Sequence, residues 1–201
     1  MWQKFCKFLL HTLGGWRVEM TVPHQDKCII CVAPHTSNWD FIIAELYYHS
    51  IGRRAGFLMK REWFFWPMGC LFRSLGGVPV ERSRKTSLTD QLAERALAAK
   101  NHFELAVTPE GTRSLSTKWK RGFYFIALKA NLPIQLYALD FPGKRIVCTK
   151  TLYPTGNVEA DMREIMEYYR PYQGKYPGKF AVEEIPAPES KLQEAETHPS
   201  A

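Results

Sequence analysis

Short apolar runs alternate along the chain with segments in which apolar positions recur every three or four residues. The apolar runs, typical of buried strands, cover residues 27–33, 57–60, 78–80, 105–108, 134–139 and 146–152. The helical spacing covers 38–49, the segment through 71–75, 88–100, 122–130 and 158–169. This alternation predicts a single α/β domain with a central mixed β-sheet flanked by helices. We assign the domain to residues 21–185, since the Pro, Glu and Ser content of residues 186–201 indicates a disordered tail.

Residues 1–20 predict an N-terminal amphipathic helix. Its apolar positions form one stripe: Trp2, Phe5, Cys6, Leu9, Leu10, Leu13 and Trp16. With Lys4 and Lys7 on its flank, the stripe is typical of a helix that lies in a membrane interface. It equally suits a helix packed on the domain's own core, which is the commoner fate. No run reaches the ~20 apolar residues needed to cross a bilayer, and His11 interrupts the run that would resemble a signal peptide.

Charge is distributed unevenly over the 201 residues. The whole chain carries a formal +7, while residues 181–201 contain five Glu and one Lys, so the first 180 residues carry +11. A body this basic favours an anionic partner, which can be nucleic acid, an anionic membrane surface or a phosphorylated substrate. The hydrophobic content of 45% excludes a wholly disordered chain.

The cysteines indicate packing more than chemistry. Five Cys is an odd number, and a chain of this size folds without disulfides, so a reducing compartment is expected. Cys28 and Cys31 form a C-x-x-C pair inside an apolar run, and no second such pair completes a zinc site. We interpret both as buried hydrophobic residues, with redox or metal use as the alternative, and we expect neither a metal nor a cofactor.

A candidate acid–base pair follows the first apolar run. Pro34-His-Thr-Ser-Asn-Trp-Asp40 places a carboxylate about one helical turn beyond a histidine at a strand end. The carboxylate can fold back onto the imidazole and fix its tautomer, which leaves the other nitrogen to take a proton from a hydroxyl. By itself this spacing is also compatible with a capped helix start and nothing more.

Three further strand ends each supply a cation. These are Lys60, Arg82 and, in Thr108-Pro-Glu-Gly-Thr-Arg-Ser114, Arg113. Gly111 allows the backbone to approach a ligand closely, and an arginine can contact a phosphate through two parallel hydrogen bonds. Because ligands bind at strand ends in open α/β sheets, we expect these residues and His35 to share one site.

Four blocks in this order resemble those of the glycerolipid acyltransferases, the family of bacterial 1-acylglycerol-3-phosphate (lysophosphatidic acid) acyltransferases. The blocks are His35-x4-Asp40, Gly77-Val-Pro-Val-Glu-Arg82, Pro109-Glu-Gly-Thr-Arg113 and Leu132-Pro133-Ile134, within residues 32–139. The resemblance implies that His35 is the general base on the acceptor hydroxyl and that Asp40 orients it. It also implies that seven residues bind substrate: Lys60, Arg82, Glu110, Gly111, Thr112, Arg113 and Pro133. The first six belong to the acceptor side. Pro133 belongs to the acyl-donor side.

The same resemblance implies the substrates and their location. The acyl donor is a thioester, either acyl-CoA or acyl-carrier protein, and the acceptor is a lysolipid. The protein is therefore expected at the cytoplasmic face of a membrane, as a peripheral protein. The aromatic run 63–66 lies beside Arg53-Arg54 and Lys60-Arg61 and suits docking to lipid, although core packing is the alternative.

Several residues depart from the family pattern and leave the acceptor open. Pro34 stands where Asn is frequent, Thr108 where Phe is usual and Trp63 where Leu is common. A lysolipid without a phosphate, such as a lyso-amino-acid lipid, is thus an alternative acceptor. From another class, a basic nucleic-acid-binding module would use the same charge. It would need neither His35 nor Asp40, and no nucleic-acid motif is visible, so we expect no nucleic-acid partner.

Overall fold

Strands and helices alternate in the computed structural model, which describes residues 1–80 and 87–182. Within these ranges the strands are β1 (Arg17–Met20), β2 (Lys27–Ala33), β3 (Gly56–Lys60), β4 (Gly77–Val80), β5 (Phe103–Val107), β6 (Ile134–Asp140) and β7 (Arg145–Leu152). The α-helices are α1 (Trp2–Lys7), α2 (Asn38–Ser50), α3 (Met68–Ser74), α4 (Leu88–Ala98), α5 (Gly122–Ala130) and α6 (Val158–Tyr169). Shorter turns are the π-helical η1 (Phe8–Leu13) and the 3₁₀ turns η2 (Arg61–Trp63) and η3 (Pro177–Lys179). Every strand and helix predicted between residues 27 and 169 is present, while β1 was not predicted. The expected tail, 186–201, lies outside the described residues.

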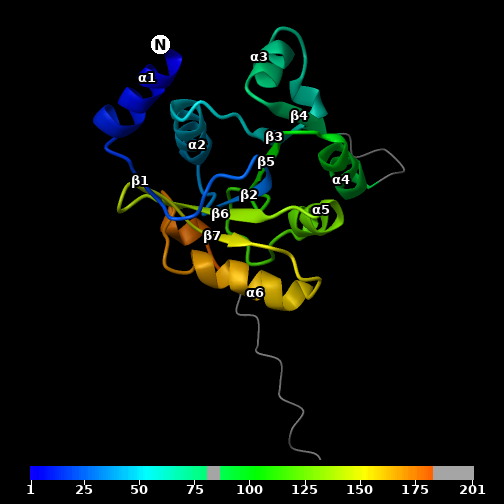
Figure 1. Cartoon of the computed structure of the whole chain (residues 1–201). Coiled ribbons are helices and arrows are strands. Elements are labelled where there is room, and N and C mark those ends of the chain that lie inside the picture. Colours follow the sequence, from blue (N-terminus) through cyan, green and yellow to red (C-terminus); the bar gives the residue numbers. More distant parts are fainter. Residues whose placement is uncertain (81–86, 183–201) are drawn as a thin grey trace, which may run out of the picture.

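The strands form one mixed sheet in the order β1-β7-β6-β2-β5-β3-β4 (Figure 1). β2 pairs in parallel with β5 and β6, and β3 pairs in parallel with β4 and β5. β7 runs antiparallel to β6, and β1 pairs with β7 in parallel. The carboxyl ends of β2, β3, β4 and β5 therefore meet at one edge of the sheet. This confirms the predicted α/β fold and brings the loops that follow these strands together.

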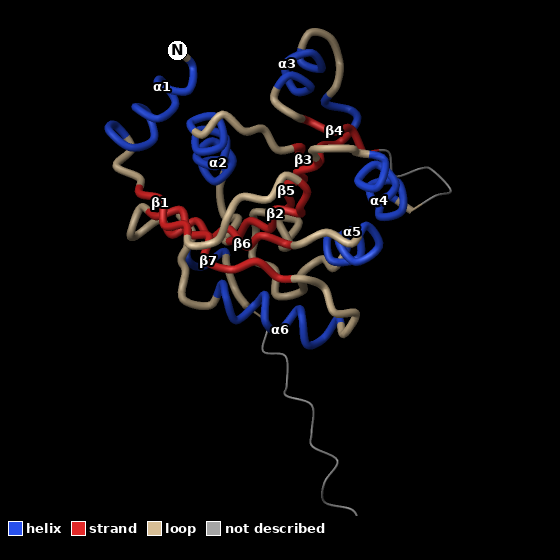
Figure 2. Tube along the Cα trace, in the orientation of Figure 1, coloured by secondary structure: helices blue, strands red, loops and turns tan. Residues whose placement is uncertain are grey.

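Helices cover both faces of the sheet, so the protein has two cores. α4, α5 and α6 pack on one face around residues such as Leu92, Tyr124 and Ile165. α2 and the N-terminal helices cover the other face, with Ile43 and Leu10 in the second core. Figure 2 shows α6 on the side of the sheet opposite α1 and α2. A three-layer α/β domain results.

The central strand β2 is buried on both faces, which decides the question of the C-x-x-C pair. Successive side chains of a strand point to opposite faces. Cys28 accordingly belongs to one core and Cys31 to the other. Burial raises the pKa of both thiols well above the usual range. Both cysteines are thus apolar core residues, and the described residues contain no His, Cys, Asp and Glu cluster suited to a metal ion.

The N-terminal apolar stripe is divided between two environments. Cys6, Leu10 and Trp16 are buried, and the ring of Trp16 packs edge-on against Phe141 at 5.0 Å. Other members of the stripe face solvent: Trp2, Phe5 and Leu13. Part of the stripe therefore packs on the domain's own core, which is the alternative that the sequence left open, and the exposed part stays a candidate for a membrane interface. None of the helices in the described ranges has the length and apolarity needed to span a bilayer.

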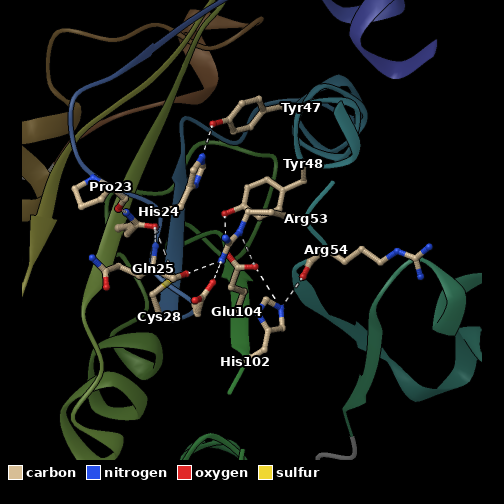
Figure 3. Close-up of polar contacts among 12 residues, drawn as sticks. Pro23, His24, Gln25, Cys28, Tyr47, Tyr48, Arg53, Arg54, His102 and Glu104 are labelled. Atoms are coloured by element: carbon tan, nitrogen blue, oxygen red, sulfur yellow. Dashed lines mark hydrogen bonds and ion pairs between the residues drawn. The ribbon is translucent and has the colours of Figure 1, made fainter. Parts of the chain in front are cut away.

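A polar cluster around the buried Glu104 occupies the edge of the sheet opposite the predicted site (Figure 3). The Glu104 carboxylate, at the start of β5, accepts hydrogen bonds from Arg53 at 3.1 Å and from the Tyr48 hydroxyl at 3.4 Å. Arg53 also pairs with Asp26 at 2.8 Å, and His102 lies 3.3 Å from Glu104. Burial raises the pKa of Glu104, and the charge of Arg53 opposes that shift. The cluster ties the carboxyl end of α2 to the amino ends of β2 and β5.

Candidate active site

The turn between β2 and α2 places the His35–Asp40 pair at the carboxyl edge of the sheet. Ser37 is the N-cap of α2, and Asp40 occupies the third helical position in a capping box. Asp40 Oδ2 accepts the amides of Thr36 at 2.6 Å and Ser37 at 2.7 Å, and Oδ1 accepts the Ser37 hydroxyl at 2.8 Å. Asp40 is only 2% exposed. The capping interactions thus hold this carboxylate in one position.

The same carboxylate contacts the imidazole of His35. His35 Nδ1 lies 3.2 Å from Asp40 Oδ2, and the histidine side chain is 20% exposed. A proton on Nδ1 is shared with the carboxylate, so the lone pair of the neutral ring resides on Nε2. Asp40 therefore caps the helix and contacts the histidine at the same time, so the two interpretations of the sequence spacing are compatible.

A second carboxyl group holds the backbone of His35. Glu110 Oε1 accepts the His35 amide at 2.8 Å, and Glu110 is only 3% exposed. Burial raises the pKa of the Glu110 carboxyl to about 7. Glu110 Oε2 is buried and has no hydrogen-bond partner among the described residues. The resemblance assigned Glu110 to the acceptor, whereas its observed contact is with the turn that carries His35.

A cleft of about 710 Å³ opens beside His35. Its walls come from β2, α2, β3, β5, the first residue of α4 and the loops after β3 and β5. They are mainly apolar: Val32, Phe41, Ala44, Phe57, Leu58, Met59, Leu88, Ala106 and Val107. Polar or flexible positions gather near the strand ends: His35, Asp40, Arg61, Glu62, Thr108 and Gly111. Cavities of this size hold drug-sized or larger ligands. A cleft with a polar end and an apolar wall suits an amphiphilic molecule.

Glu45 is a lining residue that the sequence reasoning did not single out. It lies on α2 four residues after Phe41, and the two side chains share one helix face along the cleft. Burial raises the pKa of the Glu45 carboxyl to about 7. Glu45 Oε2 also lies 3.4 Å from His49 Nε2, one turn further along. The four-residue spacing between Phe41 and Glu45 was the sequence feature that could have placed Glu45 on the same helix face.

The loop after β5 carries the third predicted block. Gly111 has a φ of +66°, a left-handed conformation that favours glycine, and it lines the cleft. Thr112 and Arg113 are exposed on the same loop. The side chain of Lys120 covers Gly111, because a Cβ added there would lie 3.2 Å from Lys120 Cγ. Lys120 is thus a further cation beside the cleft that the sequence reasoning missed.

The structure brings some predicted residues together and not others. Lys60 ends β3 at the same edge as His35, but its side chain is outside the described part, as is the whole of Arg82. Pro133 lies at the other edge, where its carbonyl accepts the Ile29 amide at 2.9 Å. Ile29 and Ala33 are about 13 Å apart along β2. Because β2 and β6 are parallel, the residue before β6 cannot reach the carboxyl edge.

The aromatic run after β3 is mostly at the surface. Trp63, Phe65 and Trp66 are 54%, 56% and 85% exposed. Phe64 instead packs against Phe72 of α3, with ring centroids 6.1 Å apart. One of the four rings, the half-buried Phe64, therefore packs on a neighbouring helix.

Comparison with known proteins identifies the family of the chain. The family model for acyltransferases matches residues 17–139. The fold is similar to that of the 1-acyl-sn-glycerophosphate (LPA) acyltransferase PlsC from Thermotoga maritima, with a TM-score of 0.56 and 18% identity over 84% of this chain and 75% of that one. No curated protein sequence matches the chain. The match covers both loops around the cleft and confirms the resemblance to the glycerolipid acyltransferases. The chain belongs to the acyltransferase family.

Proposed function

We propose that this protein transfers a fatty acyl group from an acyl thioester to the hydroxyl of a lysophospholipid such as 1-acylglycerol-3-phosphate. The observation that carries the proposal is the His35–Asp40 pair, 3.2 Å apart, at the polar end of the apolar cleft. The relative from Thermotoga maritima, by its name, acts on 1-acyl-sn-glycerophosphate. An acyl chain fits the apolar walls, and a glycerol headgroup fits the polar end.

The chemistry needs only one proton carrier from the protein. His35 Nε2 takes the proton of the acceptor hydroxyl while the hydroxyl oxygen attacks the thioester carbonyl. When the tetrahedral intermediate collapses, the carbon–sulfur bond breaks and the same nitrogen returns the proton to the departing thiolate. Asp40 keeps Nδ1 protonated and balances the positive charge that forms on the ring. The reaction requires no metal or cofactor, because the thioester itself supplies the activated acyl group.

Cations beside the cleft favour an acceptor that carries a phosphate. Arg113 is exposed on the loop after β5, and the Lys120 stem covers Gly111 on the same loop. Charge-assisted hydrogen bonds from such side chains are about twice as strong as neutral ones. The donor is either acyl-CoA or acyl-carrier protein, both of which present the thioester at the end of a long carrier arm.

Substrates of this kind reside in a membrane, so we further propose peripheral binding at the cytoplasmic face. α1, α2 and α3 lie on the side of the molecule opposite α6 (Figure 1). Each has exposed apolar side chains on or next to it, among them Phe5, Ile42 and Trp66. Exposed aromatic residues are typical of surfaces that lie in the headgroup region. This arrangement would place the cleft next to the lipid surface.

The first experiment tests the base. His35→Ala abolishes release of free thiol from an acyl thioester in the presence of 1-acylglycerol-3-phosphate, and Asp40→Asn loses most of the activity. His102→Ala, at the opposite edge of the sheet, serves as the matched control and retains wild-type turnover. Turnover of His35→Ala near the wild-type rate would refute the mechanism.

The second experiment tests the acceptor. Arg113→Ala raises the KM for the lysophospholipid far more than the KM for the thioester, while Arg95→Ala, an exposed arginine of α4, changes neither. Equal effects on both substrates would assign the cation to the donor's phosphates. An unchanged KM, together with turnover of a lysolipid that lacks a phosphate, would favour the alternative acceptor.

A further inference from the structure

The C-terminal segment, residues 170–182, follows α6 and lies outside the residues 17–139 that match the family model. We propose that this segment positions the active site by holding both the turn that carries His35 and the loop that carries Glu110 and Gly111. The proposal rests on the proposed function only for its kinetic readout. Its structural part, which states which contacts hold the turn that carries His35, does not depend on the proposed function.

The segment is anchored at the end of β6. The Phe141 amide donates to the Gln173 carbonyl at 2.9 Å, and the Gln173 amide lies 3.4 Å from Asp140 Oδ1. Asp140 is itself paired with Arg145 at 2.8 Å. Just before the segment, the buried Tyr169 hydroxyl donates to the Cys31 carbonyl of β2 at 2.6 Å. The segment is thus tied to two adjacent strands of the sheet before it reaches the turn.

The segment then contacts the turn directly. The Tyr176 amide donates to Thr36 Oγ1 at 3.2 Å, and Thr36 is only 1% exposed. Gly174 packs so closely that an added Cβ would lie 2.6 Å from Thr36 Cγ2 and 3.1 Å from Pro34 Cβ. Pro34 and Thr36 flank His35 on both sides in the chain. Contact at these two residues restricts where the imidazole between them can lie.

The same segment holds the second loop. Trp119, in the loop between β5 and α5, is buried, and its indole N–H donates to the Ala181 carbonyl at 3.3 Å. Its ring packs against Tyr169 and Phe180, with centroids 5.6 Å and 6.1 Å away. The next residue, Lys120, donates its amide to the Pro109 carbonyl at 2.7 Å. The anchored tryptophan therefore holds the end of this loop against its start, next to Glu110.

A single methyl group at Gly174 tests the idea. Carbon atoms pack at about 3.5–4.0 Å, so a Cβ at 2.6 Å from Thr36 Cγ2 forces a displacement of about 1 Å. Misplacement of a reacting group by that distance costs about a hundredfold in rate. We expect Gly174→Ala to lower kcat about a hundredfold and to leave KM within about twofold, since the cleft walls stay in place. Gly178→Ala, in the same segment, meets no atom within 4 Å and keeps wild-type kinetics.

A second pair of variants removes the hydrogen bond without adding bulk. Thr36→Val keeps the shape of the side chain but cannot accept the Tyr176 amide, so it lowers kcat, whereas Thr36→Ser retains the acceptor and recovers most of the loss. This pair decides the question if Gly174→Ala does not fold. Nitrogen resonances of the His35 imidazole, which report its tautomer, provide a readout that does not depend on turnover.

The outcomes separate this proposal from the proposed function. Shifted His35 resonances in Gly174→Ala and Thr36→Val, with wild-type resonances in Gly178→Ala and Thr36→Ser, support it even if no lysolipid tested is acylated. Absence of acyl transfer by the wild-type protein would count against the proposed function alone. Wild-type kcat and unchanged His35 resonances in folded Gly174→Ala and in Thr36→Val would overturn the role of the segment.

Discussion

Replacing Glu110 by glutamine is expected to stabilise the protein above neutral pH. Glu110 is 3% exposed, its Oε1 accepts the His35 amide at 2.8 Å, and its Oε2 has no partner among the described residues. Glutamine keeps an oxygen that can accept the same amide, but it carries no charge. The substitution therefore removes the cost of an ionised carboxylate in a buried position while preserving the contact with the turn that carries His35.

The magnitude follows from the pKa of this carboxyl. Burial raises it from the ordinary 4.5 to about 7 in the folded protein. Between pH 4.5 and about pH 7 this carboxyl has lost its proton in the unfolded chain but keeps it in the folded protein. The free energy of unfolding therefore falls as the pH rises and levels off above about pH 7. The difference corresponds to roughly 3 kcal/mol of stability that is present below pH 4.5 and lost by about pH 8.

Urea unfolding at pH 5, 6, 7 and 8 measures the effect. We expect Glu110→Gln to be more stable than the wild type by an amount that grows by about 2–3 kcal/mol from pH 5 to pH 8. Glu45, whose pKa burial also raises to about 7, is present in both proteins and cancels in the comparison. Glu94→Gln, at an exposed position on α4, is the control and shows no such trend. A constant difference between Glu110→Gln and wild type at all four pH values would refute the reasoning.

Three further predictions concern stability and docking. Arg53→Ala leaves Glu104 buried without its charge partner, and its unfolding free energy in urea should fall by about 3 kcal/mol. Leu10→Ala should cost about 2–5 kcal/mol in the same assay, because this side chain belongs to the core beneath α1; a smaller loss would show that the helix is dispensable for folding. Trp66→Ser should reduce co-sedimentation with anionic vesicles at unchanged Tm, whereas Leu97→Ser, on α4, should not; equal binding by both variants would place the docking surface elsewhere.

Local patterns in the chain were sufficient to predict most of the secondary structure and the contact between His35 and Asp40. Apolar periodicity predicted β2 and α2, because a segment buried on one or both faces must repeat its apolar residues with the period of its own backbone. The distance from His35 to Asp40 spans one strand end and one helical turn, so a contact within that span depends on neighbours in sequence alone. The observed distance of 3.2 Å between His35 Nδ1 and Asp40 Oδ2 agrees with the predicted contact.

Contacts between distant segments were decided only by the tertiary structure. The edge strand β1 has exposed and half-buried residues in alternation and no apolar run. It forms because its backbone pairs in parallel with β7. The N-terminal stripe showed that a helix has an apolar face, but only packing determined that Leu10 is buried while Leu13 faces solvent. Glu110 and Gly174 contact the turn that carries His35 from about 75 and 140 residues away in the chain, and the apolar periodicity of a segment does not predict such distant contacts. The apolar periodicity of a segment predicts that one of its faces is buried. Which other segment buries that face depends on how the whole chain packs.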